Sequence, residues 1–183
     1  MEEPTMATAY YGRADDTSVL RLAGQIRYAL ARTLRAFVDG VIAPAACAAV
    51  FIDLREVDFI DSTGLGLIAR IGRLTLESRG RRAAIVVAPG DVEVTLRSAG
   101  FDELFVMLAD FPYDPAVELR EIPLSGLASP QDSRMDSRMD SQMGHLILDA
   151  HRDLAAVSEE SRETFRQVIE SLEADLEHTE TRT

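Results

Sequence analysis

The junction between a strand and a helix at residues 48–71 constrains the fold of this chain more than any other stretch. The small and apolar run at residues 48–54 is typical of a strand buried on both faces of a sheet. The polar turn Asp61-Ser62-Thr63-Gly64 follows, and the apolar-rich residues 65–71 continue into a helix. The first turn of a helix has free backbone N–H groups and the positive end of the helix dipole. Both would hold a phosphate group on Ser62, which makes this serine the first candidate for a functional residue.

Apolar patterning along residues 1–110 alternates between the strand and the helix period. Strands are expected at residues 7–13, 19–23, 48–54 and 83–87, helices at 25–41, 62–78 and from an Asp91 N-cap to Gly100, and an edge strand within 101–108. A turn signal separates the first two strands, which predicts a hairpin. This alternation indicates an α/β fold in which helices pack on a mixed β-sheet.

The character of the sequence changes after residue 110. Residues 111–142 are rich in turn-forming and polar residues and contain a tandem Asp-Ser-Arg-Met repeat, so we interpret them as a linker. Residues 143–180 carry an apolar stripe at helical spacing, which predicts a C-terminal amphipathic helix or a helical hairpin broken near Ser158. Such a stripe is too apolar to stay exposed, and we expect it to be buried on the domain or in a homodimer.

The charge of the chain excludes several classes of function. The net charge is -12, so nucleic acid and anionic membrane surfaces are not expected partners. All 19 basic residues are Arg, and the absence of Lys excludes both a Schiff-base lysine and a P-loop lysine. No apolar run approaches the roughly 20 residues that span a bilayer. The N-terminus lacks the features of a signal peptide, and we expect a cytoplasmic protein.

Neither the cysteine nor the histidines predict a metal or cofactor site. Cys47 is the only cysteine, so there is no internal disulfide, and we interpret it as a small core residue. His145 and His151 are too far apart in the sequence to act as a metal-binding pair on one helix turn. We expect these two and His178 to be solvated helix residues, and the chain to bind no cofactor.

Two interpretations of Ser62 remain open from the residues alone. Ser62 could be an unmodified helix N-cap, worth about 1 kcal/mol. A functional role is favoured by Asp61 and Thr63, which supply more polar groups than one cap needs. Gly64 and Gly66 each cost a helix about 1 kcal/mol relative to Ala. They would leave a flat surface that the backbone of a partner can approach.

A rival motif lies in the same stretch. Residues 64–69, Gly-Leu-Gly-Leu-Ile-Ala, match a loose dinucleotide-binding fingerprint, G-x-G-x-x-G/A. That fingerprint requires the first glycine to follow its strand directly, whereas Asp61-Ser62-Thr63 intervenes here. The motif therefore receives little weight.

Residues 53–68, Asp-Leu-Arg-Glu-Val-Asp-Phe-Ile-Asp-Ser-Thr-Gly-Leu-Gly-Leu-Ile, resemble the signature of the STAS domain, the fold of bacterial anti-sigma factor antagonists. In that family an Asp-Ser-Ser/Thr-Gly-Leu-Gly turn begins a helix, and the serine after the Asp is phosphorylated. The resemblance covers roughly residues 7–110 and implies a STAS-like sheet with Ser62 as the phosphorylation site. The residues expected to bind the partner are Asp61, Thr63, Gly64, Leu65 and Gly66.

One position departs from the family pattern. Arg27 stands where the usual antagonist has an Asp at the entrance to the first long helix. Residues 19–28 and 148–154 are similar to stand-alone STAS proteins of the symbiosis-polysaccharide (Syp) type, which regulate biofilm formation. The resemblance implies a regulator without catalysis, switched by a serine kinase and a phosphatase and docking a downstream regulatory protein. The alternative is an α/β sensor domain that binds a nucleotide or small molecule.

Overall fold

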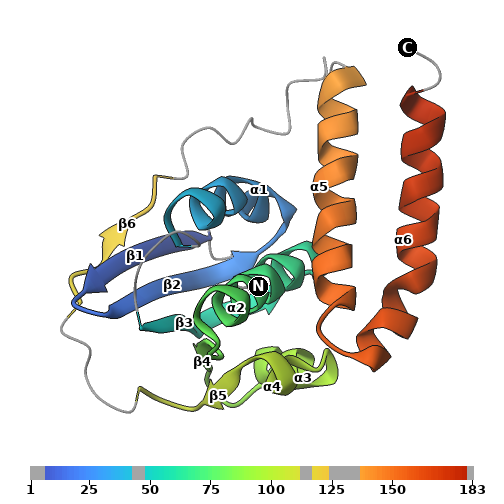
Figure 1. Ribbon diagram of the computed structural model, residues 1–183. Helices are drawn as coiled ribbons and strands as arrows, with labels where there is room; N and C mark the ends of the chain where they lie inside the picture. The colour runs from blue at the N-terminus through green and yellow to red at the C-terminus, as the bar shows by residue number, and fades with distance from the viewer. Residues whose placement is uncertain (1–6, 43–47, 112–116, 124–136, 181–183) are drawn as a thin grey trace, which may run out of the picture.

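A six-stranded mixed sheet with helices forms the body of the molecule, and a pair of C-terminal helices stands beside it (Figure 1). The computed structural model describes residues 7–42, 48–111, 117–123 and 137–180. The strands are β1 (Thr8–Ala14), β2 (Thr17–Ile26), β3 (Ala49–Ile60), β4 (Ala84–Val86), β5 (Val106–Leu108) and β6 (Arg120–Glu121). The helices are α1 (Tyr28–Phe37), the π-helical turn η1 (Val38–Ile42), α2 (Ser62–Arg79), α3 (Asp91–Ser98), α4 (Phe101–Leu104), α5 (Ser137–Ala155) and α6 (Glu159–Glu180).

The strand order is β5-β4-β3-β2-β1-β6. β1 and β2 form the expected antiparallel hairpin, and β6 pairs antiparallel with the outer side of β1. β2, β3, β4 and β5 run parallel, each joined to the next through helical segments. Parallel neighbours require such crossovers, so the alternating pattern of the sequence leads directly to this mixed sheet.

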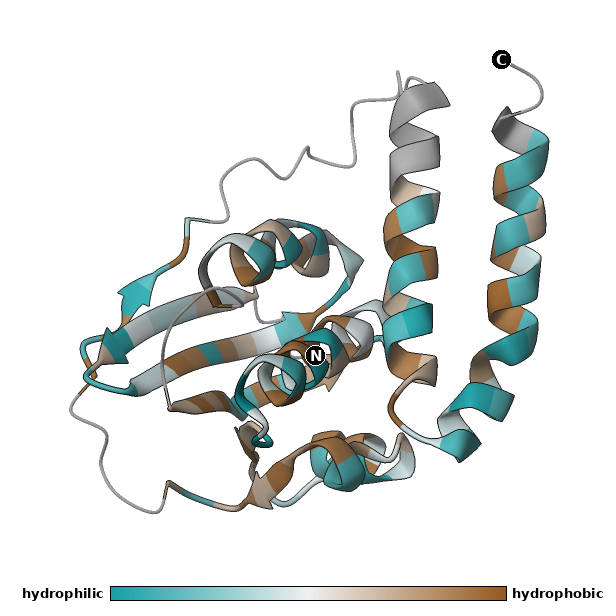
Figure 2. Ribbon diagram, viewed as in Figure 1, coloured by the Kyte–Doolittle hydropathy of each residue, from teal (hydrophilic) through white to brown (hydrophobic). Residues whose placement is uncertain are grey.

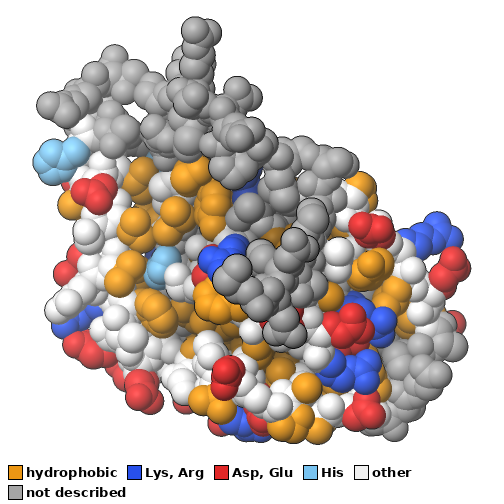
Figure 3. Space-filling view, turned by 180° about the vertical axis from the view of Figure 1, so that it is seen from behind, with side chains coloured by type: hydrophobic (Ala, Val, Ile, Leu, Met, Phe, Trp, Pro, Cys, Tyr) orange, Lys and Arg blue, Asp and Glu red, His pale blue; other side chains and the backbone are white. Residues whose placement is uncertain are grey.

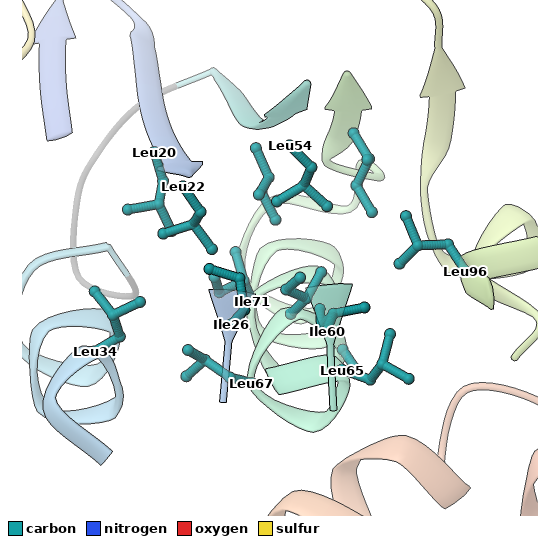
Figure 4. Packing of buried hydrophobic residues seen from close by; sticks show 14 of the residues in the cluster. Leu20, Leu22, Ile26, Leu34, Leu54, Ile60, Leu65, Leu67, Ile71 and Leu96 are labelled. Atoms are coloured by element: carbon teal, nitrogen blue, oxygen red, sulfur yellow. The ribbon is translucent and has the colours of Figure 1, made fainter. Parts of the chain in front are cut away.

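The two faces of the sheet are covered differently, because successive strand residues point to opposite faces. Leu20, Ile52 and Ile85 belong to the main core beneath the helices, whose packing is shown in Figure 4. Val19 and Phe51 belong to a smaller cluster on the other face. Phe111, Val117 and Leu119 pack against that cluster. The central strands are therefore apolar on both faces, as the run at residues 48–54 predicted.

Several boundaries differ from the expectation. β3 continues to Ile60, because its outer half mixes buried and exposed residues instead of forming an apolar run. α3 begins at Asp91, but the capping position is Gly90 and no side chain caps it, so the expected Asp91 cap is wrong. The edge strand expected within residues 101–108 is β5, but it is only three residues long and follows the short helix α4.

The interval expected to be a linker contains ordered elements. β6 lies within 111–142 and pairs with β1, and Ile122 joins the main core at 7% exposure. Two polar residues are too short a signal for a strand, so this element was missed. α5 begins at Ser137, before the expected helix start at residue 143. The first part of the tandem repeat, residues 132–136, and Cys47 lie outside the described residues.

The C-terminal segment is a helical hairpin, the second of the two arrangements expected from the sequence. α5 ends at Ala155, Ser158 Oγ accepts a hydrogen bond from the Ser161 backbone N–H, and α6 begins at Glu159. α5 lies between the domain and α6, and the apolar residues of α6 lie toward α5 (Figure 2). The α5 part of the stripe is thus buried on the domain of the same chain, whereas α6 packs against α5 and its Val168 is 41% exposed.

Candidate functional site

Asp61 joins the beginnings of two helices. Its Oδ1 accepts a hydrogen bond from the Gly64 backbone N–H at 2.8 Å, which caps α2. Its Oδ2 accepts one from the Tyr28 backbone N–H, also at 2.8 Å, which satisfies the first residue of α1. Arg27, at the capping position of α1, makes no side-chain cap of its own. One carboxylate therefore faces the positive ends of two helix dipoles.

Ser62 is the first residue of α2 and does not cap it. The capping position belongs to Asp61, so the interpretation of Ser62 as an N-cap is wrong. The Ser62 side chain is half-exposed and makes no hydrogen bond within the described part of the chain. Its hydroxyl is therefore not used by the fold, and it lies beside the free N–H groups of the first helical turn.

Most of the residues expected to bind a partner are buried by the chain itself. Thr63 and Leu65 are each 6% exposed. A Cβ on Gly64 would come within 2.8 Å of the Ile26 side chain, so this glycine permits close packing of α2 on β2. Of the proposed contact residues, only Asp61 remains half-exposed, next to Ser62.

Gly66 permits a close approach, as expected, but the approaching backbone belongs to the same chain. A Cβ at this position would overlap the backbone of Ala150 in α5. The expectation that Gly66 lies on an open surface is wrong for this arrangement of the chain, because the hairpin covers it. The sequence could not give this result, since α5 lies some 80 residues further along.

The dinucleotide interpretation of residues 64–69 fails on geometry. The glycines of that fingerprint must lie in the turn between strand and helix, where a pyrophosphate can approach the backbone. Gly64 and Gly66 lie inside α2 and are both buried by protein atoms.

Arg27 lies on the chain segment next to Ser62. The Asp61 backbone N–H donates to the carbonyl of Ile26 at 3.0 Å. This hydrogen bond brings Arg27, which follows Ile26, close to Ser62, which follows Asp61. The Arg27 guanidinium lies 4.7 Å from the centre of the Phe59 ring and donates to Gln25 at 3.1 Å. The departure from the family pattern thus places an exposed cation near the start of α2.

The α1–α2 face toward the hairpin carries three arginines that the sequence analysis did not single out. Arg35 donates to Asp149 at 2.9 Å, and Arg73 donates to Asp153 at 2.6 Å. Arg70 lies 3.5 Å from Asp153. Each partner is separated from its arginine by 80 or more residues, so no local pattern indicates these contacts.

A buried carboxylate on the other face of the sheet has a structural role. Asp53 is 2% exposed and accepts hydrogen bonds from Arg21 at 2.9 Å and from Arg55 at 3.0 Å. Burial alone would raise the pKa of Asp53, but the hydrogen bonds from Arg55 and Arg21 outweigh it and hold that pKa below its usual value. Asp53 is therefore ionised and neutralised at neutral pH.

No cluster of three or more His, Cys, Asp or Glu side chains suited to a metal ion occurs in the described residues. His145 and His178 are exposed, as expected, but His151 is 7% exposed, which corrects its assignment as a solvated residue. Its Nδ1 lies 2.8 Å from the Ile147 carbonyl, and its ring meets the edge of Phe165.

Among the described helices, none is both long and apolar enough to span a membrane.

This chain is similar to solved structures of anti-sigma factor antagonists. An antagonist from Mycobacterium paratuberculosis is 24% identical with a TM-score of 0.51, over 61% of this chain and 92% of that chain. The antagonist SpoIIAA in its unphosphorylated form is 22% identical with a TM-score of 0.47, over 54% and 87%. The Bacillus cell fate determinant SpoIIAA in the phosphorylated form is 20% identical with a TM-score of 0.42, over 54% and 90%. The curated proteins include no match.

The family profile of the STAS domain covers residues 11–118, which include every strand except the first residues of β1 and the whole of β6. The profile ends before α5, so the hairpin is an addition to the domain. Since the match spans more than half of the sequence, and the mixed sheet with its helices agrees with it, this chain belongs to the STAS domain family.

Proposed function

We propose that this protein is a regulator that acts through protein–protein contacts and is switched by phosphorylation of Ser62, without catalysis of its own. The observation that carries the proposal is the position of Ser62: the first residue of α2, half-exposed, with a hydroxyl that makes no hydrogen bond within the described residues. A kinase can reach such a hydroxyl without unfolding the domain. SpoIIAA has been solved in an unphosphorylated and in a phosphorylated form, which is consistent with such a switch.

A phosphate on Ser62 would be stabilised locally and would change the surface more than the fold. The N–H groups of the first turn of α2 would meet it, and Arg27 supplies a cation on the neighbouring segment. Asp61 opposes the phosphate, so the net effect is a strongly negative patch at the start of α2. A partner that docks on the unphosphorylated surface would lose affinity through like-charge repulsion and desolvation.

The proposal includes a serine kinase, a phosphatase and a downstream regulatory protein in the cytoplasm. Its finer part is an output on biofilm or surface polysaccharide, supported only by the likeness of residues 19–28 and 148–154 to Syp-type proteins. Homodimerisation through the C-terminal helices is a further expectation. Val168 on α6 is 41% exposed, so sedimentation of Val168→Asp against the wild type would test whether this surface forms a dimer.

The competing function is a nucleotide or small-molecule sensor. The cavity between α1, α2 and α5, lined by residues such as Thr63, Leu67 and Ala150, has room for about one water molecule. A nucleotide does not fit in this cavity, which therefore gives the sensor alternative no support.

Mass spectrometry of the protein purified from its host tests whether Ser62 is phosphorylated, with exposed Ser78 at the other end of α2 as the internal control.

Binding is tested with Ser62→Ala, Ser62→Asp and Ser78→Asp as baits against a captured partner. Ser62→Asp should bind at least about 10-fold more weakly than the other two, because only it places charge at the docking surface. Equal affinity of all three variants would contradict the proposed switch.

A further inference from the structure

The hairpin covers the domain with a contact that is charged and not simply apolar. Asp149 and Asp153 of α5 face Arg35, Arg70 and Arg73 of the domain. Asp153 has a side chain only 8% exposed, yet it lies on a helix that the STAS profile does not include. The surface of the domain beneath α5 thus presents three arginines to two carboxylates of α5, in a chain whose net charge is -12.

The contact also has a defined shape. Gly66 lies at its centre, and the Ala150 backbone of α5 comes so close to it that no side chain fits between them. Asp149 precedes that small residue directly, and Asp153 follows it one helical turn later. The face therefore selects a helix with the pattern Asp-Ala-x-x-Asp, small at the crossing point and acidic on either side.

The arginines keep partners inside the domain when α5 is removed. Arg70 donates to Asp39 at 2.8 Å, and Arg73 donates to Glu77 at 3.0 Å. Arg35 lies 3.9 Å from the same Asp39. Losing α5 would therefore not leave isolated charges on the domain. The cost of opening lies instead in the apolar side chains that α5 buries, such as Leu154 at 0% exposure.

Packing under the hairpin is also imperfect. The water-sized cavity lies at this interface, between Ala31, Leu67 and Ala150. The hairpin is connected at its base by the Ser161 hydroxyl, which donates to the Ala99 carbonyl at 2.9 Å, and by Phe165 against the core. On the face seen in Figure 3, several acidic side chains lie along one edge of the molecule, and hydrophobic side chains gather beside them.

We infer that this α1–α2 face is a docking site for an acidic helix of a partner protein, and that α5 occupies it as a built-in competitor. The inference rests on the proposed function in so far as the face adjoins Ser62. The partner presents the same chemistry as α5: a small residue against Gly66 and carboxylates against Arg35, Arg70 and Arg73. Charge complementarity favours a helix of this kind over any basic or uncharged one.

The test uses the full chain and a fluorescently labelled peptide with the sequence of residues 143–157. Asp153→Asn weakens α5 but leaves every residue of the acceptor face unchanged. The control is Glu170→Gln, the same chemical change on the exposed part of α6, where Glu170 lies 3.9 Å from Arg166. Hydrogen exchange of α2 reports opening of the hairpin, and exchange of β2 and β3 reports whether the domain remains folded.

Asp153→Asn should increase exchange in α2 and bind the peptide at least about 10-fold more tightly than the wild type, because the open state is more populated. Glu170→Gln should behave as the wild type. A peptide with Asn in place of both aspartates should not show this increase in affinity. The double variant Asp153→Asn with Gly66→Leu should also bind the original peptide no more tightly than the wild type does. Ala150→Leu, which puts a larger side chain at a position that is only 4% exposed, is the second opening variant.

Three results would overturn the inference. The first is an opened hairpin, by exchange, with no gain in peptide affinity. The second is unchanged exchange in both Asp153→Asn and Ala150→Leu, which would make the hairpin a permanent part of the fold. The third is a concentration-dependent dimer that excludes the peptide, which would assign the face to a second copy of the chain. All measurements use unphosphorylated protein, so failure of Ser62 phosphorylation leaves their outcome unaffected.

Discussion

Removing the Asp61 carboxylate should destabilise this protein more than the loss of an ordinary helix cap. The side chain accepts two backbone hydrogen bonds of 2.8 Å, one at the start of each of two helices. A single cap contributes about 1 kcal/mol, and a hydrogen bond to a charged group about 1.5–3 kcal/mol. Because Asp61 is only half-buried, water replaces part of each bond, and we expect Asp61→Ala to cost about 2–4 kcal/mol.

Asp61→Asn separates the two bonds. The amide has one oxygen, so it can accept from Gly64 or from Tyr28, while its NH₂ group then faces the other N–H donor. We expect Asp61→Asn to lower the free energy of unfolding by about 1–2 kcal/mol, which is less than the effect of Asp61→Ala. Asp58→Ala is the matched control, because Asp58 is an exposed acid on the same strand end, and it should change stability by less than about 0.5 kcal/mol.

Urea denaturation measures these differences. With a slope of about 2 kcal/mol per molar urea, Asp61→Ala should lower the midpoint by about 1–2 M at an unchanged slope. The stability of a natural domain is about 5–15 kcal/mol, so the variant should remain folded without urea. A midpoint shift as small as that of Asp58→Ala would refute the double cap. So would a loss of amide protection at Gly64 with none at Tyr28.

Two further outcomes follow from the buried side chains. The pKa of Asp53 is below its usual value in the folded protein, so its contribution is complete above about pH 4 and lost as the pH falls through the folded pKa. The difference in unfolding free energy between the wild type and Asp53→Asn should therefore be constant near neutral pH and shrink in acid, and a difference independent of pH would contradict this. Phe165→Asp should cost about 1–3 kcal/mol and loosen the hairpin, because Phe165 packs on the core and against His151. Circular dichroism in urea measures this loss, and the exposed Val168→Asp on the same helix should be nearly neutral; equal effects would show that the α6 stripe is not anchored.

The sequence alone determined the features that depend on neighbouring residues. The apolar run at residues 48–54 and the glycine-rich helix after it located β3 and α2, and Ser62 proved to be the first residue of that helix. The period of the C-terminal stripe predicted helix over residues 143–180, but it left open whether this is one helix or a hairpin broken near Ser158. Such patterns are local, because a strand repeats every two residues and a helix every 3.6.

Only the tertiary structure decided which surfaces meet. Periodicity shows that one face of α5 is buried, but not that it is buried on Gly66, and nothing near Asp61 in the sequence indicates that it also caps α1. His151 is buried for the same reason: α6 folds back over it. Contacts between segments 80 or more residues apart depend on the path of the whole chain. The ion pairs of Asp149 and Asp153 therefore exist only once the sheet has placed α1 and α2 side by side.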